Sequence, residues 1–311
     1  MAHHDFIPTT YYNTMGTHPP ALHIEPGDSV ATTAVDARGF DHENEERAGR
    51  PNPQTGPFHV NGAEAGDTLV LQLHEVVPNR RMGWTTGRLA PNVLDFGYEA
   101  NFSDEVELAY WDVDVEAGTV TLTEPQNRLT GQPLPLKPML GTVGVAPDIG
   151  EAISTMTSAA HGGNMDYIGI KPGVTVYLPV FADGGLFFLG DGHALQGDGE
   201  MDGTGVEISM DVRFSLDLIK GKTIGWPRAE DDTYLMACGN HRPLDQAVQH
   251  ATTEMVSWLE TDYGLTTREA HMLLGRFVEY DVGNMFDPAY TMVCKVRKSV
   301  LAVLGFARTD S

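Results

Sequence analysis

The stretch TVYLPVFADGGLFFLGDGHALQGDGE, residues 175–200, joins apolar segments directly to a cluster of ionisable groups. Its two apolar runs have the length of buried strands, and the glycine pair between them is typical of a turn. The last eleven residues, 190–200, then contain two aspartates, one histidine, one glutamate and four glycines. Because glycine lets the backbone bend sharply, these acids and the imidazole can converge on one point. The stretch therefore predicts a strand that ends in a site.

Similar apolar runs recur at short spacing through the first three quarters of the chain. Several alternate apolar with polar residues, and turn sequences such as EPGD (25–28) and EAGD (64–67) precede them. Alternation of this kind is typical of half-buried strands. The predicted strands lie in residues 28–37, 67–78, 105–114, 118–125, 174–181, 186–192 and 206–219. Even spacing with tight turns favours a β-sandwich or barrel over βαβ units.

The pattern changes to helical periodicity after about residue 240. Residues 242–264 carry an apolar stripe at helical spacing, and Gly264 would end that helix. Thr266 and Glu269 form a predicted capping box, and Pro288 is predicted to begin a further helix within 287–301. We expect a mainly β protein, with a β-rich part in residues 1–240 that carries the site and a helical α+β C-terminal portion in 241–311.

Composition narrows the possible functions. The chain has 43 acidic against 20 basic residues and a net charge of −23, so its surface repels phosphate backbones and nucleic-acid binding has little support. Two cysteines cannot form a disulfide framework, and two buried free thiols are expected. The N-terminus shows no signal-peptide pattern, and no apolar run reaches the roughly 20 residues that cross a bilayer. We expect a cytoplasmic protein without a membrane partner.

Asp191 and His193 stand two residues apart, so on an extended chain their side chains point to the same face. Carboxylate oxygen with imidazole nitrogen suits Zn²⁺, Mn²⁺ or Fe²⁺, and carboxylates alone suit Ca²⁺. In so acidic a chain, the competing interpretation of residues 190–200 is a solvated surface loop.

Two further segments resemble this one. Residues 159–169, AAHGGNMDYIG, offer His161 as a second imidazole ligand, although a structural histidine at a turn is an equal alternative. Residues 35–46, VDARGFDHENEE, place Asp36 at the end of an apolar strand, whereas the glutamates that follow suit a solvated loop. Together the three segments predict a metal site on a rigid β scaffold.

Five segments carry a resemblance to a known family: 52–73, 138–147, HGGNMD (161–166), 176–200 and GTGVEI (203–208). In this order they closely resemble the acetamidase/formamidase family, over roughly residues 15–305. The resemblance implies hydrolysis of short aliphatic amides to the acid and ammonia, a β-rich fold, oligomers built on dimers and a bound divalent metal. Leu195 and Ala160 depart from residues common in the family, and neither departure removes an ionisable group.

From the chemistry of amide hydrolysis we assign roles to the candidate residues as hypotheses. Asp36, His161, Asp191 and His193 would supply most of the metal ligands, with zinc as the predicted metal and Ca²⁺, Mn²⁺ or Fe²⁺ as alternatives. Either Glu200 or Glu207 would be the general base, and the sequence does not choose between them because one step of register reverses a side chain's face. Asp166 would orient an imidazole ligand, and Asn164 would donate to the oxyanion.

Other interpretations stay open at this point. Cys238 with His241 could form a nucleophilic pair, although a buried small hydrophobe is the favoured role for a cysteine after YLMA. The protein could be a non-catalytic, metal-stabilised β-protein, or act on a larger amide or urea-like compound with residues 80–102 lining the pocket. We expect a small amide as substrate and a homodimer or larger homo-oligomer.

Overall fold

The computed structural model describes residues 1–98 and 107–309; parts of two predicted features, residues 105–106 of a strand and 99–102 of the 80–102 segment, lie outside this range. The strands are β1 (His3–Asp5), β2 (Tyr11–Tyr12), β3 (Thr14–Met15), β4 (Leu22–Ile24), β5 (Ser29–Ala34), β6 (Gln54–Val60), β7 (Thr68–Pro78), β8 (Met82–Thr86), β9 (Leu108–Asp114), β10 (Thr119–Glu124), β11 (Pro133–Pro135), β12 (Met139–Val145), β13 (Ile153–Ser154), β14 (Ser158–Ala159), β15 (Gly162–Asn164), β16 (Thr175–Pro179), β17 (Phe187–His193), β18 (Met210–Ile219), β19 (Arg228–Glu230), β20 (Tyr234–His241), β21 (Glu279–Asn284) and β22 (Tyr290–Arg297). The helices are α1 (Leu244–Tyr263), α2 (Thr267–Phe277) and α3 (Lys298–Val303), with short 3₁₀ helices at Pro91–Val93 and Asp148–Gly150.

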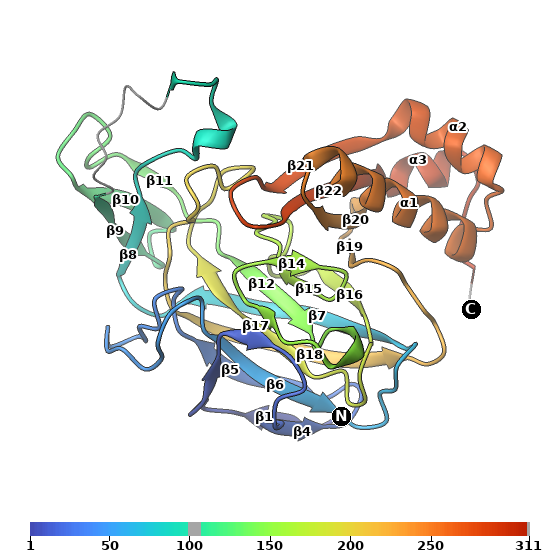
Figure 1. Cartoon of the computed structure of the whole chain (residues 1–311), viewed down its shortest axis with the longest axis horizontal. Helices are drawn as coiled ribbons and strands as arrows, with labels where there is room; N and C mark the ends of the chain where they lie inside the picture. Colours follow the sequence, from blue (N-terminus) through green and yellow to red (C-terminus); the bar gives the residue numbers. More distant parts are fainter. Residues whose placement is uncertain (99–106, 310–311) are drawn as a thin grey trace.

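Two packed sheets form the body of the molecule, as the predicted β-rich fold requires (Figure 1). Among the described residues, one sheet has nine strands in the order β1-β5-β18-β7-β16-β19-β20-β22-β21. The other has seven, in the order β14-β15-β12-β17-β6-β2 with β4 beside β6. Their facing side chains make the main core, in which Phe58 of β6 packs edge to face on Phe214 of β18 at 5.2 Å.

Strict alternation explains the long strand β18, whose sequence is MDVRFSLDLI. Its apolar members, Met210, Val212, Phe214 and Leu216, are at most 2% exposed. The polar residues between them face solvent. A strand with period two buries one face only, so this strand covers the core with one side and meets water with the other. The interpretation as a half-buried strand is confirmed for residues 210–219, whereas residues 206–209 lie before the strand and are buried.

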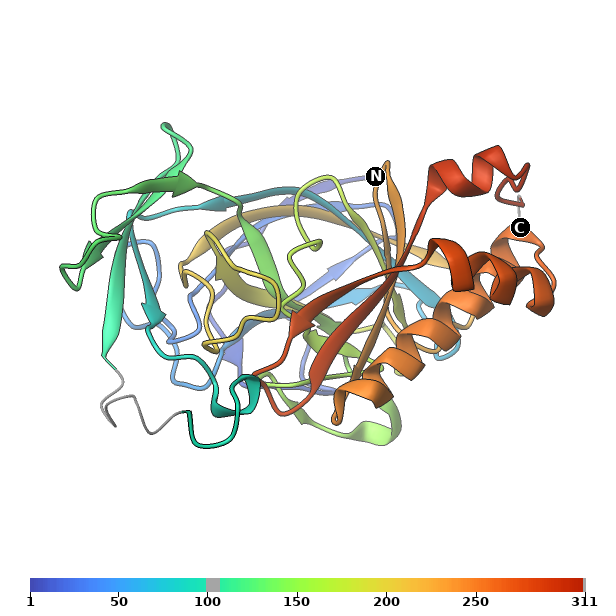
Figure 2. The same ribbon diagram turned by 90° about the horizontal axis from the view of Figure 1, so that it is seen from above.

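The C-terminal helices cover one end of the nine-stranded sheet (Figure 2). α1 buries Met255, Trp258 and Leu259 against β20 and β22, and Gly264 in the left-handed conformation ends the helix. Thr266 and Glu269 form the predicted capping box at the start of α2. The sequence-based expectations for these two helices are confirmed.

The prediction of a helix that begins at Pro288 is wrong. Residues 290–297 form β22, which pairs with β20 on one side and β21 on the other, and only α3 beyond them is helical. The segment TMVCKV combines β-branched residues with a place between two strands, and this pairing satisfies its backbone on both sides. Because β21 and β22 extend the nine-stranded sheet, the C-terminal portion shares a sheet with the strands before residue 240.

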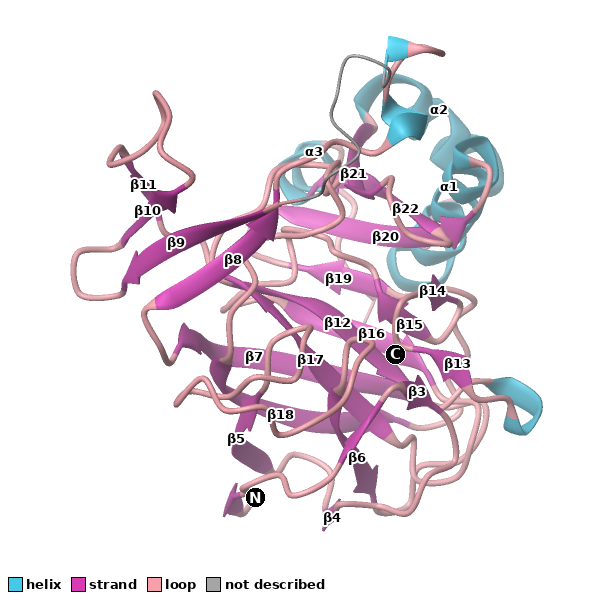
Figure 3. Ribbon diagram, turned by 60° about the vertical axis from the view of Figure 1, so that its left-hand side comes forward, coloured by secondary structure: helices cyan, strands magenta, loops and turns pink. Residues whose placement is uncertain are grey.

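A smaller sheet, in the order β11-β10-β9-β8, projects from the other end of the molecule (Figure 3). One of its contacts with the two large sheets is a β-bridge between the backbones of Trp84 in β8 and Glu207. No described helix is both long enough and apolar enough to cross a membrane.

Candidate functional site

The end of β17 brings Asp191 and His193 together, as their spacing predicts. Asp191 has a left-handed backbone (φ 59°), and its Oδ1 lies 3.6 Å from Nε2 of His193. Facing them, Gly141 of β12 has no side chain, and a Cβ there would collide with carboxylate oxygens of Asp191 and Asp166. The glycine is therefore what allows two carboxylates to meet over one strand.

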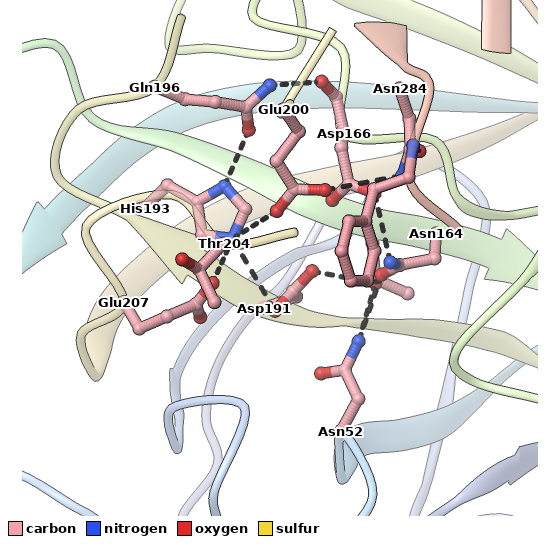
Figure 4. A network of polar contacts seen from close by, with 12 residues as sticks. Asn52, Asn164, Asp166, Asp191, His193, Gln196, Glu200, Thr204, Glu207 and Asn284 are labelled. Atoms are coloured by element: carbon pink, nitrogen blue, oxygen red, sulfur yellow. Dashed lines mark hydrogen bonds and ion pairs between the residues drawn. The ribbon is translucent and has the colours of Figure 1, made fainter. Parts of the chain in front are cut away.

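Both candidate bases join this cluster. Glu207 is held in place by backbone hydrogen bonds with Trp84, and its Oε1 lies 2.9 Å from Nε2 of His193. Glu200 follows a turn whose Gly199 exchanges backbone hydrogen bonds with Val282 and Met285, and its Oε1 lies 3.9 Å from the same nitrogen. Figure 4 shows these carboxylates arranged around the imidazole.

A fourth segment, which contains Asn284 and Asp287 and was not predicted from the sequence, completes the cluster. Asn284 donates to Asp166 (2.6 Å) and Glu200 (3.2 Å), and its Oδ1 accepts the backbone N–H of Asp287 at 2.9 Å. Asn164 donates to both Asp166 (2.9 Å) and Asp287 (2.5 Å). Gly-Asn-Met occurs at 163–165, directly before Asp166, and again at 283–285, where Phe286 separates it from Asp287. That repetition is the signal that could have found Asn284 and Asp287.

The site concentrates negative charge. Asp166, Asp191, Glu200, Glu207 and Asp287 are all at most 5% exposed; the first four lie around one histidine, His193, and Asp287 lies beside Asp166 and Glu200. Burial raises the pKa of Glu207 to about 8 and that of Asp287 to about 6, and neighbouring carboxylates add to both shifts. Burial opposes a charge on His193, but Glu207 and Asp191 outweigh it and raise the pKa of this imidazole well above its usual value.

This donor set fits a divalent cation. Within this cluster, three sets of residues each have ligand atoms that lie within 4.8 Å of one another. The sets are Asp166–Asp191–His193, His193–Glu200–Glu207 and Asp166–Glu200–Asp287. Asp166 Oδ1 and Glu207 Oε2 are buried with no hydrogen-bond partner in residues 1–98 and 107–309, and His193 Nε2 faces carboxylate oxygens of Asp191, Glu200 and Glu207. Buried polar atoms are normally satisfied, and a cation would satisfy Asp166 Oδ1 and offset the repulsion among the acids. One imidazole with several carboxylates is a set that Zn²⁺ or Mn²⁺ accepts.

The cluster opens into a pocket of about 250 Å³. Asp191, Glu200, Glu207 and Asp287 line it, together with residues of the loop from Ala37 to Asn52. Trp84, from the predicted 80–102 segment, also lines the pocket.

The structure does not place Asp36 among the donors. Its Oδ1 accepts the backbone N–H groups of Arg38 (2.9 Å) and Phe40 (3.0 Å). Its Oδ2 accepts from the Trp84 ring at 3.0 Å and pairs with the buried guanidinium of Arg80. With both oxygens used, Asp36 anchors the pocket wall, and we remove it from the proposed ligand set.

Asp36→Ala is therefore expected to destabilise the fold and leave metal content unchanged. Arg80, whose side chain is 4% exposed, would lose its partner, which costs about 3–5 kcal/mol for a buried pair. Urea unfolding and metal analysis of the purified variant check both parts. The exposed Asp232→Ala serves as control, with a change below about 0.5 kcal/mol. Loss of metal at an unchanged unfolding midpoint would return Asp36 to the ligands.

His161 also lies outside the three donor groups. It is 1% exposed, and neither ring nitrogen has a hydrogen-bond partner in the described part of the chain. Burial lowers the pKa of His161 to about 4, so the ring is neutral. We keep no ligand role for it.

The roles predicted for Asp166 and Asn164 also change. Gln196, and not Asp166, orients the imidazole: its Oε1 lies 2.7 Å from Nδ1 of His193, and its Nε2 donates to the backbone oxygen of Asp166 at 2.6 Å. Asp166 offers a carboxylate oxygen to the donor groups directly. Asn164 has both N–H bonds committed to carboxylates, so it holds the acids in place and has no donor left for an oxyanion.

The cysteine alternative finds no support in the geometry. Cys238 is 1% exposed, and burial raises the pKa of its thiol to about 12. His241 lies an odd number of residues away on the same strand, β20, and is exposed. Both cysteines are free and buried, as expected.

Fold and site together define a two-sheet β protein with a buried carboxylate–imidazole centre. Residues 149–293 match the Acetamidase/Formamidase family. The acetamidase of Yersinia enterocolitica has the same fold (TM-score 0.82) and is 33% identical, over 96% of this chain and 93% of that one. The chain belongs to the acetamidase/formamidase family, as the resemblance indicated.

More distant relatives agree. The acetamidase of Mycolicibacterium smegmatis is 27% identical over an alignment of 217 residues, and the match covers 54% of this chain and 53% of that protein. The formamidase of Methylophilus methylotrophus is 25% identical over an alignment of 250 residues, and the match covers 63% of this chain and 61% of that protein. The matched part thus spans between half and two thirds of the length of these curated relatives.

Proposed function

We propose that this protein hydrolyses short-chain aliphatic amides, such as formamide and acetamide, to the carboxylic acid and ammonia. The observation that carries the proposal is a cluster of five buried carboxylates, four of them around one imidazole, beside a pocket in a member of this family. A cytoplasmic location and a homodimeric or larger assembly are part of the proposal, and light scattering tests the assembly.

Asp166, Asp191 and His193 would hold the divalent cation, with zinc as the first choice because of the imidazole and Mn²⁺, Fe²⁺ or Ca²⁺ as alternatives. When bound, it would act as a Lewis acid that polarises the amide carbonyl. Gln196 fixes the orientation of His193 through Nδ1, and Asn164 and Asn284 hold Asp166 in place.

Glu207 is the general base in this proposal. One of its oxygens contacts His193, whereas Oε2 has no hydrogen-bond partner in the described residues and is free to accept a proton. Glu200 has an oxygen bound to Asn284. Glu207 would take a proton from the attacking water and return it to the leaving nitrogen, since amines leave poorly without protonation.

Purified protein incubated with millimolar formamide, acetamide and propionamide is expected to release ammonia in proportion to enzyme concentration. Coupled detection of ammonia gives the rate, and the acid product confirms the reaction. A protein that binds metal but releases no ammonia from any of these amides would support the non-catalytic alternative instead.

A further inference from the structure

One wall of the pocket is a loop that folds back on itself. The backbone N–H groups of Arg47 and Ala48 donate to the carbonyl of Gly39, at 2.8 and 3.3 Å. A Cβ on Gly39 would collide with the carbonyl of Ala48, so the two arms lie closer than any other residue would permit. Each arm presents an arginine to the pocket, Arg38 from the first and Arg50 from the second.

Neither pocket arginine forms an ion pair with an acidic residue in the part of the chain that the structure describes. The acids of the same loop pair elsewhere: Asp41, Glu43 and Glu45 all contact the third loop arginine, Arg47, at 2.5, 3.2 and 2.7 Å. The chain has 43 acidic and 20 basic residues. The two pocket arginines are therefore without an ion pair even though acidic residues outnumber basic ones.

Arg38 is held in a defined orientation. Its guanidinium lies 4.3 Å from the centre of the Trp84 ring, and this ring is fixed by its own hydrogen bond to Asp36. Stacking uses the face of the guanidinium and leaves its N–H edge for a planar anion. Burial and then repulsion by the charge of Arg50 lower the pKa of Arg38, although the charges of Asp36 and Glu207 act in the opposite direction. A bound anion would relieve that repulsion.

The pocket is also larger than acetamide needs. Its volume is about 250 Å³, whereas acetamide, with four heavy atoms, occupies roughly the space of two to three water molecules at ~30 Å³ each. The acids of the proposed catalytic centre and the two arginines line this same pocket. A substrate that contacted both would place its amide at the acids and a negative group at the arginines.

We propose that Arg38 and Arg50 form a carboxylate-binding subsite, and that the preferred substrates are monoamides of short dicarboxylic acids. Guanidinium groups bind carboxylates through paired N–H···O bonds with a defined geometry. The net charge of −23 repels anions at long range, but salt screens it beyond about 8–10 Å, and contact with two cations dominates inside the pocket. This inference rests on the proposed amide hydrolysis and narrows its substrate class.

The test compares each monoamide with its diamide, which has the same shape but no charge. The kcat/KM for malonamate, succinamate and glutaramate is divided by the value for malonamide, succinamide and glutaramide. For at least one chain length we expect a ratio of ten or more in the wild type. Arg38→Gln and Arg50→Gln should each lower that ratio at least tenfold, and Arg38→Lys should lower it less because it keeps the charge.

Arg128→Gln is the matched control, since Arg128 is exposed and lies outside the pocket; its ratio should equal that of the wild type. Arg50 is exposed, so its replacement keeps the test valid if the Arg38 variant does not fold. Ratios near or below one at every length in the wild type, or an unchanged ratio in both glutamine variants, would overturn the subsite.

Calorimetry separates this inference from the proposed reaction. Succinamate binding to the wild type that weakens at least tenfold in Arg50→Gln supports the subsite even if no amide is hydrolysed. Hydrolysis of acetamide without measurable binding of any of the three monoamides supports the reaction and rejects the subsite.

Discussion

Glu207→Gln is expected to lower kcat/KM for acetamide by about 10²–10⁴, the usual contribution of a general base. Glutamine keeps the shape of the side chain but cannot accept and return a proton. Because Asp166, Asp191 and His193 remain, the variant should retain its metal. Steady-state ammonia release and metal analysis of the same preparation measure both quantities, and the pH profile of kcat/KM should lose the ionisation that Glu207 contributes.

Two further variants make this result specific. Glu116→Gln changes an exposed glutamate on the smaller sheet and should leave kcat/KM within about twofold of the wild type. Glu200→Gln tests the other candidate base, since Glu200 lines the same pocket. A larger loss in Glu200→Gln than in Glu207→Gln would move the general base to Glu200.

Asp191→Asn is expected to remove metal and activity together. Loss of an outer-shell partner typically costs 10–100-fold in metal affinity, so a lost ligand should cost at least about 100-fold. Asparagine tolerates the left-handed backbone of this position, so the local structure should survive. Metal titration gives the affinity, and the ammonia assay gives the activity.

The chain offers a matched control in the same segment. Asp198 stands in a second Gly-Asp-Gly sequence seven residues further on, but its side chain is exposed. Asp198→Asn should therefore keep wild-type metal affinity and activity. An Asp191→Asn protein with full metal content would show that the cation is held elsewhere.

The sequence was most informative where local pattern decides the outcome. Alternation identified the strand from Met210 to Ile219, because burial of one face imposes period two. The spacing of Asp191 and His193 placed both at the end of a strand, and the structure brings them within 3.6 Å. Both results depend on neighbours in the chain.

The predictions that were wrong concern residues whose structural partners are distant in sequence. The sequence places Asp36 at a strand end, but its role follows from Arg80 and Trp84, which only the tertiary fold brings to it. Pro288 suits the first position of a helix and the basic residues further on suit its C-terminal end, yet pairing with two strands overrides that preference. Asn284 and Asp287 are likewise brought to Asp166 and Asn164 only by the tertiary fold.

Our central proposal is that the buried cluster around His193 holds a cation and hydrolyses amides with it. The most direct measurement strips the protein with a chelator, verifies metal removal, and then follows ammonia release from acetamide while Zn²⁺ is added back in known amounts. We predict that activity is lost on removal and returns in proportion to the metal bound. Undiminished ammonia release from verified metal-free protein would contradict the claim.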